Sequence, residues 1–539
     1  MSLSQFPNNK WIALLAWVPL FVFLSIGLAR SIDFKFHDFG NYYYGAQVML
    51  DGQFDEQIYN ADYCNTLIKD QYSPAYFGAF YPNPPSLAML YSPLAQVPPR
   101  KAKLMLNLGS VLFFLMTVKL LVARWQLSLV PIVLLPIVFS YPIYQCILFG
   151  QPYLMMMGLI ILGYLSLGPS DQSYRKSIGY LAWPLAILLK VSPVVLLSIP
   201  LLERRWRDLL TLAAIIVGGG LLSLIWIDLD TWIYYITDVL SRVSDGILYN
   251  AYAVGAESLP VLLRHLFLQD ALLNPTPLIA SASLFGLVFA LSKGLLYTIG
   301  IIANGSNGIP TGQKVALWMI LLLLLSPNIS SYGLIYLIFP YLYLCKLSGK
   351  VDIPATVIIL LVSLYKQEWV VDFPLIFQFG KLIGVSIFLA YFIYISGLTK
   401  YLITRWTALL LAGLTTLFCI LGGKWQTGNQ GNYAFDKNQK VLLHDYTIDT
   451  VNSALLMINH SVEGFDTLAH RINIPPQYKP SPLSAKEQNL FDNKVKSTKG
   501  ATYQHPIKVG NTLYYITDEG RAPGFYVIKQ VNLDSLSVN

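Results

Sequence analysis

Long apolar runs, separated by short clusters of charge, dominate the first 423 residues of the chain. A run of about 20 apolar residues is long enough to cross the hydrocarbon core of a bilayer as one helix. The candidate membrane spans are residues 11–29, 104–118 with a continuation to Ala123, 125–170, 209–227, 271–292, 382–399 and 406–423. The run 125–170 has 46 residues, so we expect it to cross twice with a turn near Gly150-Gln151-Pro152. Arg30, and no small-residue cleavage site, follows the first run, which predicts a retained span rather than a signal peptide.

Two further apolar runs have basic residues at both ends and are too short to cross twice at full length. Residues 177–202 contain three prolines and a single charge, Lys190. Residues 315–345 are interrupted at Ser326-Pro327-Asn328. Both patterns predict short, broken helices that dip into the membrane. Such helices are tolerated where they line a protein-enclosed or wet cavity, so we expect a site that opens from the outer face.

The distribution of positive charge orients this map, because basic residues gather on the cytoplasmic side. Basic clusters flank many of the spans, at Lys119/Arg124, Arg175/Lys176, Arg204/Arg205/Arg207, Lys346/Lys350 and Lys400/Arg405. With these inside, residues 31–102 form a first outer loop and residues 228–277 a second. We expect about 11–13 membrane segments, some short or re-entrant, with a cytoplasmic N-terminus.

Composition supports a membrane protein. Hydrophobic residues make up 55% of the 539 residues and charged residues 12%, and the mean hydropathy is +0.52. This excludes a soluble enzyme, a disordered protein and a coiled coil. The net charge of +8 is spread thinly beside apolar runs, which indicates topology rather than nucleic-acid binding. The four cysteines form no CxxC motif and imply neither a disulfide framework nor a zinc site.

A change in charge density divides the chain into two parts. Residues 424–539 hold 12 basic and 10 acidic residues, a far higher density than residues 1–423. We therefore expect a polytopic membrane domain at 1–423 and a soluble extracytoplasmic domain at 424–539. Alternating residues in 511–517 and 524–528 predict two paired strands, and 444–460 has a helical pattern, so the tail is predicted to be a small α/β domain.

Two carboxylates in the first outer loop are candidates for a general base. Asp38 follows the end of the first span closely, so its carboxylate lies near lipid headgroups, and it precedes the aromatic run Tyr42-Tyr43-Tyr44. If that run begins a helix, the helix dipole favours the ionised form of Asp38. Asp33 is nearer the span and close to Lys35, which would neutralise it. The alternative is an ordinary solvated acid beside an aromatic belt.

Several cations are candidates for binding a phosphate. Lys190 is the only ionisable residue in its apolar run, and an intramembrane charge suggests a functional site. Arg242, Arg264 and His265 lie in the second outer loop, the last two on a predicted interfacial helix from Leu259 to Leu268. A snorkelling lysine and solvated loop charges are the alternatives.

Cofactor motifs are missing from the chain. It contains no Walker A, GxGxxG, HExxH or GxSxG sequence, and its tail histidines lack metal-ligand spacing. We expect no cofactor and no resident metal site, although a divalent metal stays open.

The ordered motifs resemble the C-type glycosyltransferases of family 87, the polyprenyl-phosphate-mannose-dependent mannosyltransferase type. The resemblance rests on motifs spread over residues 40–350 and just before: Asp38-Phe39 with Tyr42-Tyr43-Tyr44-Gly45-Ala46, Gly52 and Tyr59; Tyr81-Pro82-Asn83-Pro84-Pro85; Ser92-Pro93-Leu94-Ala95 with Val97-Pro98; Gly150-Gln151; Lys190 with Pro193 before Arg204-Arg205-Trp206-Arg207; Asn250 to Leu259 before Arg264; and Ser326-Pro327. The chain departs from the family at 328–332, which lacks histidine, and at 256–259, so the donor sugar and the acceptor stay open.

The resemblance implies a C-type glycosyltransferase fold and an inverting enzyme at the outer face of the membrane. Its partners would be a polyprenyl-phosphate-sugar donor, a lipid or glycan acceptor and membrane lipids, with no nucleic acid. Asp38 would be the catalytic base, and Lys190, Arg264, His265 and Arg242 would bind the donor phosphate. The residues expected to line the acceptor and sugar sites are His37, Tyr42, Tyr43, Tyr81, Asn83, Gln151 and Glu257.

Two other functions remain open at this point. A transporter or flippase of lipid-linked saccharides would also use broken helices, a buried cation and a lipid-sized cavity. It would need access from both faces, and the chain shows no inverted repeat of the kind many transporters carry. A catalytically silent scaffold is the third reading.

Overall fold

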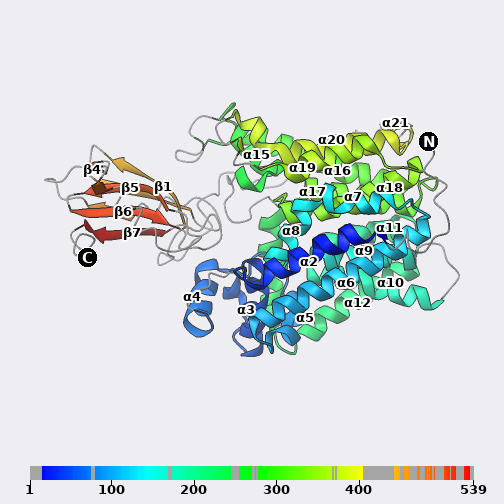
Figure 1. The fold of residues 1–539 in the computed structure, drawn as a ribbon, viewed down its shortest axis with the longest axis horizontal. Helices are drawn as coiled ribbons and strands as arrows, with labels where there is room; N and C mark the ends of the chain where they lie inside the picture. Colours follow the sequence, from blue (N-terminus) through cyan, green and yellow to red (C-terminus); the bar gives the residue numbers. More distant parts are fainter. Residues whose placement is uncertain are drawn as a thin grey trace.

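The structure is a computed structural model that describes residues 15–404, with gaps at 74–78, 168–172, 245–253, 270–273, 275–276, 367–368 and 371–372, and separate segments between 442 and 533. Most of the described chain is helical, and the long helices lie side by side (Figure 1). Four described segments are long and apolar enough to cross a membrane: α6 (Pro99–Trp125), α12 (Trp206–Ser223), α16 (Ala282–Asn304) and Leu375–Ile395, which joins η7 (Leu375–Phe379) to α20 (Gly380–Ile395).

A fifth candidate span is bent. Helices α7 (Val130–Val138) and α8 (Ser140–Phe149) meet at 63° and together pass the same test. Shorter apolar helices lie in α2 (Val18–Ile32), α9 (Tyr153–Leu167), α10 (Ser173–Leu189), η2 (Ser192–Leu197) with α11 (Ser198–Leu202), α17 (Thr311–Leu325) and α19 (Ile353–Leu364). The described residues therefore form a multi-pass helical protein with four or five full-length candidate spans and six shorter apolar helices. The expected number of 11–13 segments, some of them short or re-entrant, stays a prediction.

Breaks occur where the sequence predicted them. The turn after residue 149 ends α8, since Gly150 adopts the left-handed conformation with φ 67° and α9 begins at Tyr153. Helix α10 stops before Lys190, and η2 follows with a proline in its first turn. Helix α17 ends at Leu325 and is followed by η5 (Ser331–Leu337) and α18 (Ile338–Ser348).

Side-chain hydrogen bonds stabilise the break after α17. The Ser326 hydroxyl donates to the Asn328 carbonyl at 2.7 Å and accepts from its backbone N–H at 3.2 Å. The backbone N–H of Ile329 donates to the carbonyl of Ala256 at 2.8 Å. Irregular backbone at membrane depth is thus satisfied within the protein, as a low-dielectric environment requires.

Helices of the two predicted outer loops gather at one end of the helical bundle, at the left in Figure 1, with α3 and α4 below and α15 above. These elements are α3 (Asp38–Leu50), η1 (Glu56–Tyr59), α4 (Ala61–Gln71), α5 (Pro85–Ala95), α13 (Leu229–Tyr234), the π-helical turn η3 (Tyr235–Val239), α14 (Leu240–Ser244), η4 (Val254–Ala256) and α15 (Leu259–Phe267). The expected helix at 259–268 is confirmed as α15. The short helix α21 (Thr399–Thr404) lies at the opposite end.

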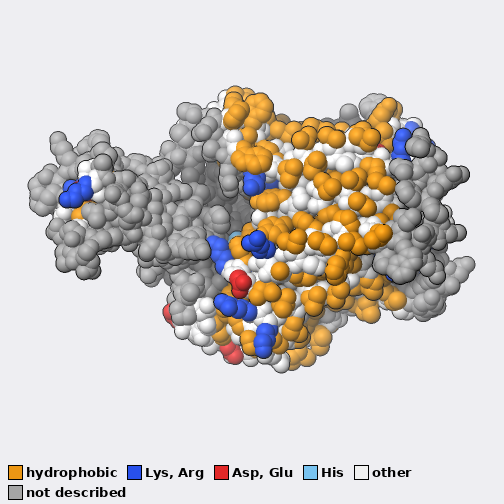
Figure 2. Space-filling view, in the orientation of Figure 1, with side chains coloured by type: hydrophobic (Ala, Val, Ile, Leu, Met, Phe, Trp, Pro, Cys, Tyr) orange, Lys and Arg blue, Asp and Glu red, His pale blue; other side chains and the backbone are white. Residues whose placement is uncertain are grey.

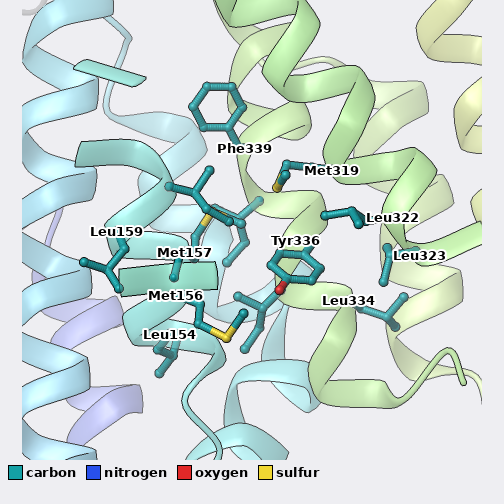
Figure 3. Close-up of a cluster of buried hydrophobic side chains, with 14 of the residues drawn as sticks. Leu154, Met156, Met157, Leu159, Met319, Leu322, Leu323, Leu334, Tyr336 and Phe339 are labelled. Atoms are coloured by element: carbon teal, nitrogen blue, oxygen red, sulfur yellow. The ribbon is translucent and has the colours of Figure 1, made fainter. Parts of the chain in front are cut away.

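A buried apolar core fixes the central helices. Side chains of α9, including Met156 and Met157, face Leu322 and Leu323 of α17, and Tyr336 of η5 lies between them (Figure 3). All five are less than 9% exposed. Close packing of this kind holds the helices at fixed spacing, so the breaks that they flank are held in place as well.

The outer surface of the bundle is apolar. Figure 2 shows hydrophobic side chains covering the face over the long helices, with charged side chains mostly near its edges. Exposed aliphatic side chains occur along α6, α12, α16 and α19, for example Leu112, Val217, Ile301 and Leu361. A soluble protein rarely exposes such a continuous apolar surface, whereas a bilayer requires it.

The described segments of the tail form two antiparallel sheets. The first has the order β1 (Leu442–Asp449), β2 (Ala454–His460), β3 (His470–Asn473). The second has the order β4 (Pro480–Ser481), β5 (Tyr503–Val509), β6 (Thr512–Thr517), β7 (Val527–Asn532). The predicted strand at 511–517 is confirmed as β6. Its partner β7 runs from Val527 to Asn532, so only residues 527–528 of the predicted strand 524–528 lie in it. The predicted helix at 444–460 is wrong, because this segment forms β1 and β2, and no α/β domain is shown.

One helix boundary differs from the expectation, and one helix was not predicted. Helix α16 begins at Ala282 and continues through Lys293, whereas the sequence placed a span at 271–292. Helix α19 was missed, because its apolar run of 12 residues is short for a span. The expected span at 406–423 lies outside the described residues.

Candidate active site

A cavity of about 370 Å³ lies where the broken helices meet the outer-loop helices. Its walls come from the start of α3, the 81–84 turn, the α8–α9 turn, the break after α10, the end of α14, the middle of α16 and the break after α17. Six of the twelve predicted site residues line it: Asp38, Tyr42, Tyr81, Asn83, Gln151 and Lys190. They come from four separate regions of the sequence, so the fold brings them together.

Asp38 is the first residue of α3. The preceding residue, His37, has φ 46° and is held in this unusual conformation by stacking on Phe149, with ring centroids 3.7 Å apart. The Nδ1 atom of His37 lies 3.3 Å from Oδ1 of Asp38. The carboxylate thus has the helix N-terminus on one side and an imidazole on the other, and both favour its ionised form.

Gln151 holds the second oxygen of Asp38. Its Nε2 donates to Oδ2 of Asp38 at 2.6 Å, and its Oε1 accepts from the Tyr42 hydroxyl at 2.6 Å. Gln151 itself is 3% exposed. A buried amide whose nitrogen donates and whose oxygen accepts has one preferred orientation, so Gln151 fixes the direction of the carboxylate.

The pKa of Asp38 lies below its ordinary value of 3.8. Burial is the largest influence and would raise this pKa. The charge and hydrogen bond of His37, the hydrogen bond of Gln151 and the charge of Lys190 together outweigh burial and lower it. Asp38 is therefore a carboxylate at neutral pH, while its side chain keeps 22% of its surface exposed and lines the cavity.

Lys190 stands at the break between α10 and η2, on the same cavity as Asp38. Its Nζ lies 5.7 Å from the ring centroid of Tyr42 and 5.1 Å from that of Tyr153. Two aromatic faces stabilise an ammonium without neutralising it. A positive charge therefore lines the cavity, where an anion could bind it.

Sequence reasoning missed part of the cavity wall. Tyr153, Asn328, Tyr332 and Tyr336 line it, all next to breaks that the sequence did predict. Lys293 also lines it and is the only charged residue of α16. In the sequence, Lys293 is a lone charge between apolar residues, and the predicted span 271–292 ends directly before it.

The other predicted site residues are placed in contacts outside the cavity lining. Tyr43 donates to the Val97 carbonyl at 2.8 Å. Arg242 lies 3.6 Å from Asp238, and Arg264 lies over the ring of Phe285 at 5.2 Å. The His265 ring is 6.4 Å from that of Phe379.

Glu257 forms a buried ion pair instead of lining the cavity. Its Oε1 lies 2.5 Å from Nζ of Lys381, and its Oε2 accepts from the backbone N–H of Lys381 at 2.9 Å. The Glu257 side chain is 1% exposed. Among the described residues, no group of three or more His, Cys, Asp or Glu side chains is arranged to hold a metal.

A multi-pass membrane protein with a charged cavity between broken helices is the class that fold and site define. Residues 81–327 match the family model described as Glycosyltransferase family 87. The resemblance is confirmed over this range, and the protein is a glycosyltransferase. The family implies the C-type glycosyltransferase fold. No curated protein and no solved structure matches the chain significantly.

The matched range contains several of the residues that line the cavity. It contains Tyr81, Asn83, Gln151, Lys190 and Lys293, whereas Asp38 precedes it. The match favours a transferase over the transporter and scaffold alternatives.

Proposed function

We propose that this protein transfers a sugar, mannose or another hexose or pentose, from a polyprenyl-phosphate-linked donor to a hydroxyl group of a lipid or glycan acceptor, with inversion at the anomeric carbon. The observation that carries the proposal is that Asp38 and Lys190 line one cavity. A carboxylate and a cation on one cavity are what displacement of a phosphate by a hydroxyl requires.

The two side chains have complementary roles in the reaction. The acceptor oxygen attacks the anomeric carbon as the bond from that carbon to the phosphate oxygen breaks. Asp38 takes the proton of the attacking hydroxyl, which is a poor nucleophile without a base. The phosphate leaves on the polyprenyl chain with added negative charge, which Lys190 stabilises. A single displacement of this kind inverts the anomeric configuration.

Residues around this pair support sugar binding. Tyr42, Tyr81, Asn83 and Gln151 bring hydroxyl and amide groups to the cavity, and aromatic faces can stack on a sugar ring. Leu322, Leu323 and Leu325 line another part of the wall, where an apolar chain would be accepted. The cavity thus combines the polar and apolar surfaces of a lipid-linked sugar.

The cavity is proposed to open at the outer face of the cell membrane, with the N-terminus cytoplasmic and the tail from Lys424 extracytoplasmic. The support is the charge bias of the sequence and the collection of α3, α4 and α15 at one end of the bundle (Figure 1). A reporter enzyme fused after Asn539 should be active only outside the cytoplasm. Cytoplasmic activity of the reporter would overturn the orientation.

The function is tested with the full-length protein purified in detergent. It is incubated with a panel of polyprenyl-phosphate sugars and with lipid or glycan acceptors, and products are identified by mass spectrometry. Product formation with the opposite anomeric configuration in NMR supports the proposal. Activity with nucleotide sugars but not with polyprenyl-linked donors would overturn the donor class, and retention of configuration would overturn the single displacement.

A further inference from the structure

The cavity reaches the apolar outer surface of the bundle at its side. Val194 of η2 and Tyr297 of α16 both line the cavity, yet each is 41% exposed. Neighbouring positions on α16, including Leu295 and Ile301, are exposed apolar residues. A residue that faces both the cavity and the outside marks an opening, and here the surrounding surface is one that suits hydrocarbon rather than water.

Lys293 lines the same cavity, four residues before Tyr297 on α16. It lies midway along α16, about 16 Å from the helix start at 1.5 Å per residue. Its Nζ donates to the Ser244 hydroxyl at 3.3 Å and to the Ser244 carbonyl, and lies 4.8 Å from the Phe289 ring. A lysine at this depth is costly, so its presence indicates a function.

The charges on the cavity wall favour an anion. Its described lining contains two lysines, Lys190 and Lys293, and one carboxylate, Asp38. Lys190 and Asp38 are assigned to the reaction itself. Lys293 therefore leaves a second positive charge on the wall, and it comes from the helix that carries Tyr297.

We infer that Val194, Ser244, Lys293 and Tyr297 form a side mouth that holds the isoprenoid chain of the donor, with Lys293 binding the phosphate as the lipid arrives from the bilayer and as polyprenyl phosphate leaves. This inference rests on the proposed function and deepens it. A chain of isoprene units matches the apolar rim, and the phosphate at its end matches the lysine. The sugar then lies toward Lys190 and Asp38.

Photo-crosslinking tests the mouth without relying on turnover. The probe p-benzoyl-phenylalanine is placed at Val194 or Tyr297 in the full-length protein, which is illuminated with a long polyprenyl phosphate. The control position is Leu112 on α6, which is exposed and apolar and does not line the cavity. We expect crosslinks at Val194 and Tyr297 well above those at Leu112, and competition by excess polyprenyl phosphate.

The cation is tested by substitution. Lys293→Met should weaken the crosslinks and raise the donor KM about tenfold, with the acceptor KM unchanged, because one charged contact is lost. Lys293→Arg should restore most of the donor affinity. Polyprenol without phosphate should crosslink equally in the probe variants with and without Lys293→Met.

The outcomes separate the two proposals. If the wild-type protein turns over polyprenyl-linked sugars but the probe variants at Val194 and Leu112 crosslink equally, the side mouth alone is overturned. A donor KM unchanged in Lys293→Met overturns the role of the lysine. A protein that crosslinks polyprenyl phosphate at Val194 but transfers no sugar from any polyprenyl-phosphate-linked donor overturns the proposed function and leaves the mouth as a lipid site.

Discussion

Gln151 donates a hydrogen bond of 2.6 Å to the carboxylate of Asp38 across 113 positions of sequence. The bond joins the turn between α8 and α9 to the first residue of α3. Since Gln151 also accepts from Tyr42 one turn further along α3, the amide contacts that helix twice. The orientation of the proposed base is therefore determined by a residue outside its own loop.

Replacing the proposed base should abolish most of the activity. Asp38→Asn keeps the size of the side chain but cannot accept the proton, so turnover should fall about 10²-fold or more. The measurement is the initial rate of sugar transfer by purified protein, with circular dichroism as the check on folding. Asp33→Asn is the matched control, since Asp33 does not line the cavity. Loss of activity in Asp33→Asn alone would move the role to Asp33.

The acidic limb of the pH–rate profile should depend on His37. The pKa of Asp38 lies below 3.8 in the folded protein, so its carboxylate, and the stability that the ionised form contributes, are lost only as the pH falls through that low value. His37→Phe retains a ring against Phe149 but removes the charge and hydrogen bond that lower the pKa. The pKa of Asp38 should rise and the acidic limb of kcat should move to higher pH. An unshifted limb would show that Asp38 is not the titrating base.

The proposed phosphate cation should affect donor use more than acceptor use. Lys190→Ala removes the charge near Asp38 and should lower kcat/KM for the donor on the order of 10²-fold. Lys190→Arg should lose less, because it keeps a positive charge. Steady-state kinetics with donor and acceptor varied separately measure this. An equal loss in both variants would point to a packing role beside Tyr42 and Tyr153.

The sequence predicted local features of this site better than its assembly. The turn at Gly150, the breaks at Lys190 and Ser326 and the helix beginning at Asp38 follow from proline, glycine and charge positions, which act locally. Lys293, Tyr332 and Tyr336 were missed because their place on the cavity wall depends on packing between distant helices. The closely spaced Leu455, Leu456 and Ile458 favour a helix at 444–460, yet pairing between β1 and β2 decides the structure.

An alanine at residue 150 should disturb the proposed base, Asp38, through its neighbour Phe39. Gly150 has φ 67°, and a Cβ there would lie 2.6 Å from the Cβ of Phe39, the residue after Asp38. Gly150→Ala should therefore cost about 1–2 kcal/mol in backbone strain alone and should lower kcat by displacing Phe39. Thermal unfolding and initial rates measure the two effects. Gly109→Ala is the control, since a Cβ at this helical position meets nothing within 4 Å and should be neutral or slightly stabilising.

The buried pair of Glu257 and Lys381 should matter for stability and, through the backbone, for the site. Glu257→Ala leaves the ammonium of Lys381 buried without its partner, which typically costs about 3–5 kcal/mol. The double variant Glu257→Gln/Lys381→Met removes both charges and should recover much of this loss. Because Ala256, the residue before Glu257, accepts from the backbone of Ile329, Glu257→Ala should also disorder the wall after Ser326 and lower turnover.

Thermal unfolding in detergent measures the size of this effect. Asp238→Asn is the control, since its partner contact with Arg242 is 3.6 Å long and Asp238 is 45% exposed, so the loss should stay below about 1 kcal/mol. A double variant as unstable as Glu257→Ala would show that the cost arises from lost packing at residue 257. A double variant with normal stability and normal turnover would show that the charges themselves are dispensable and that only an unpaired ammonium is harmful.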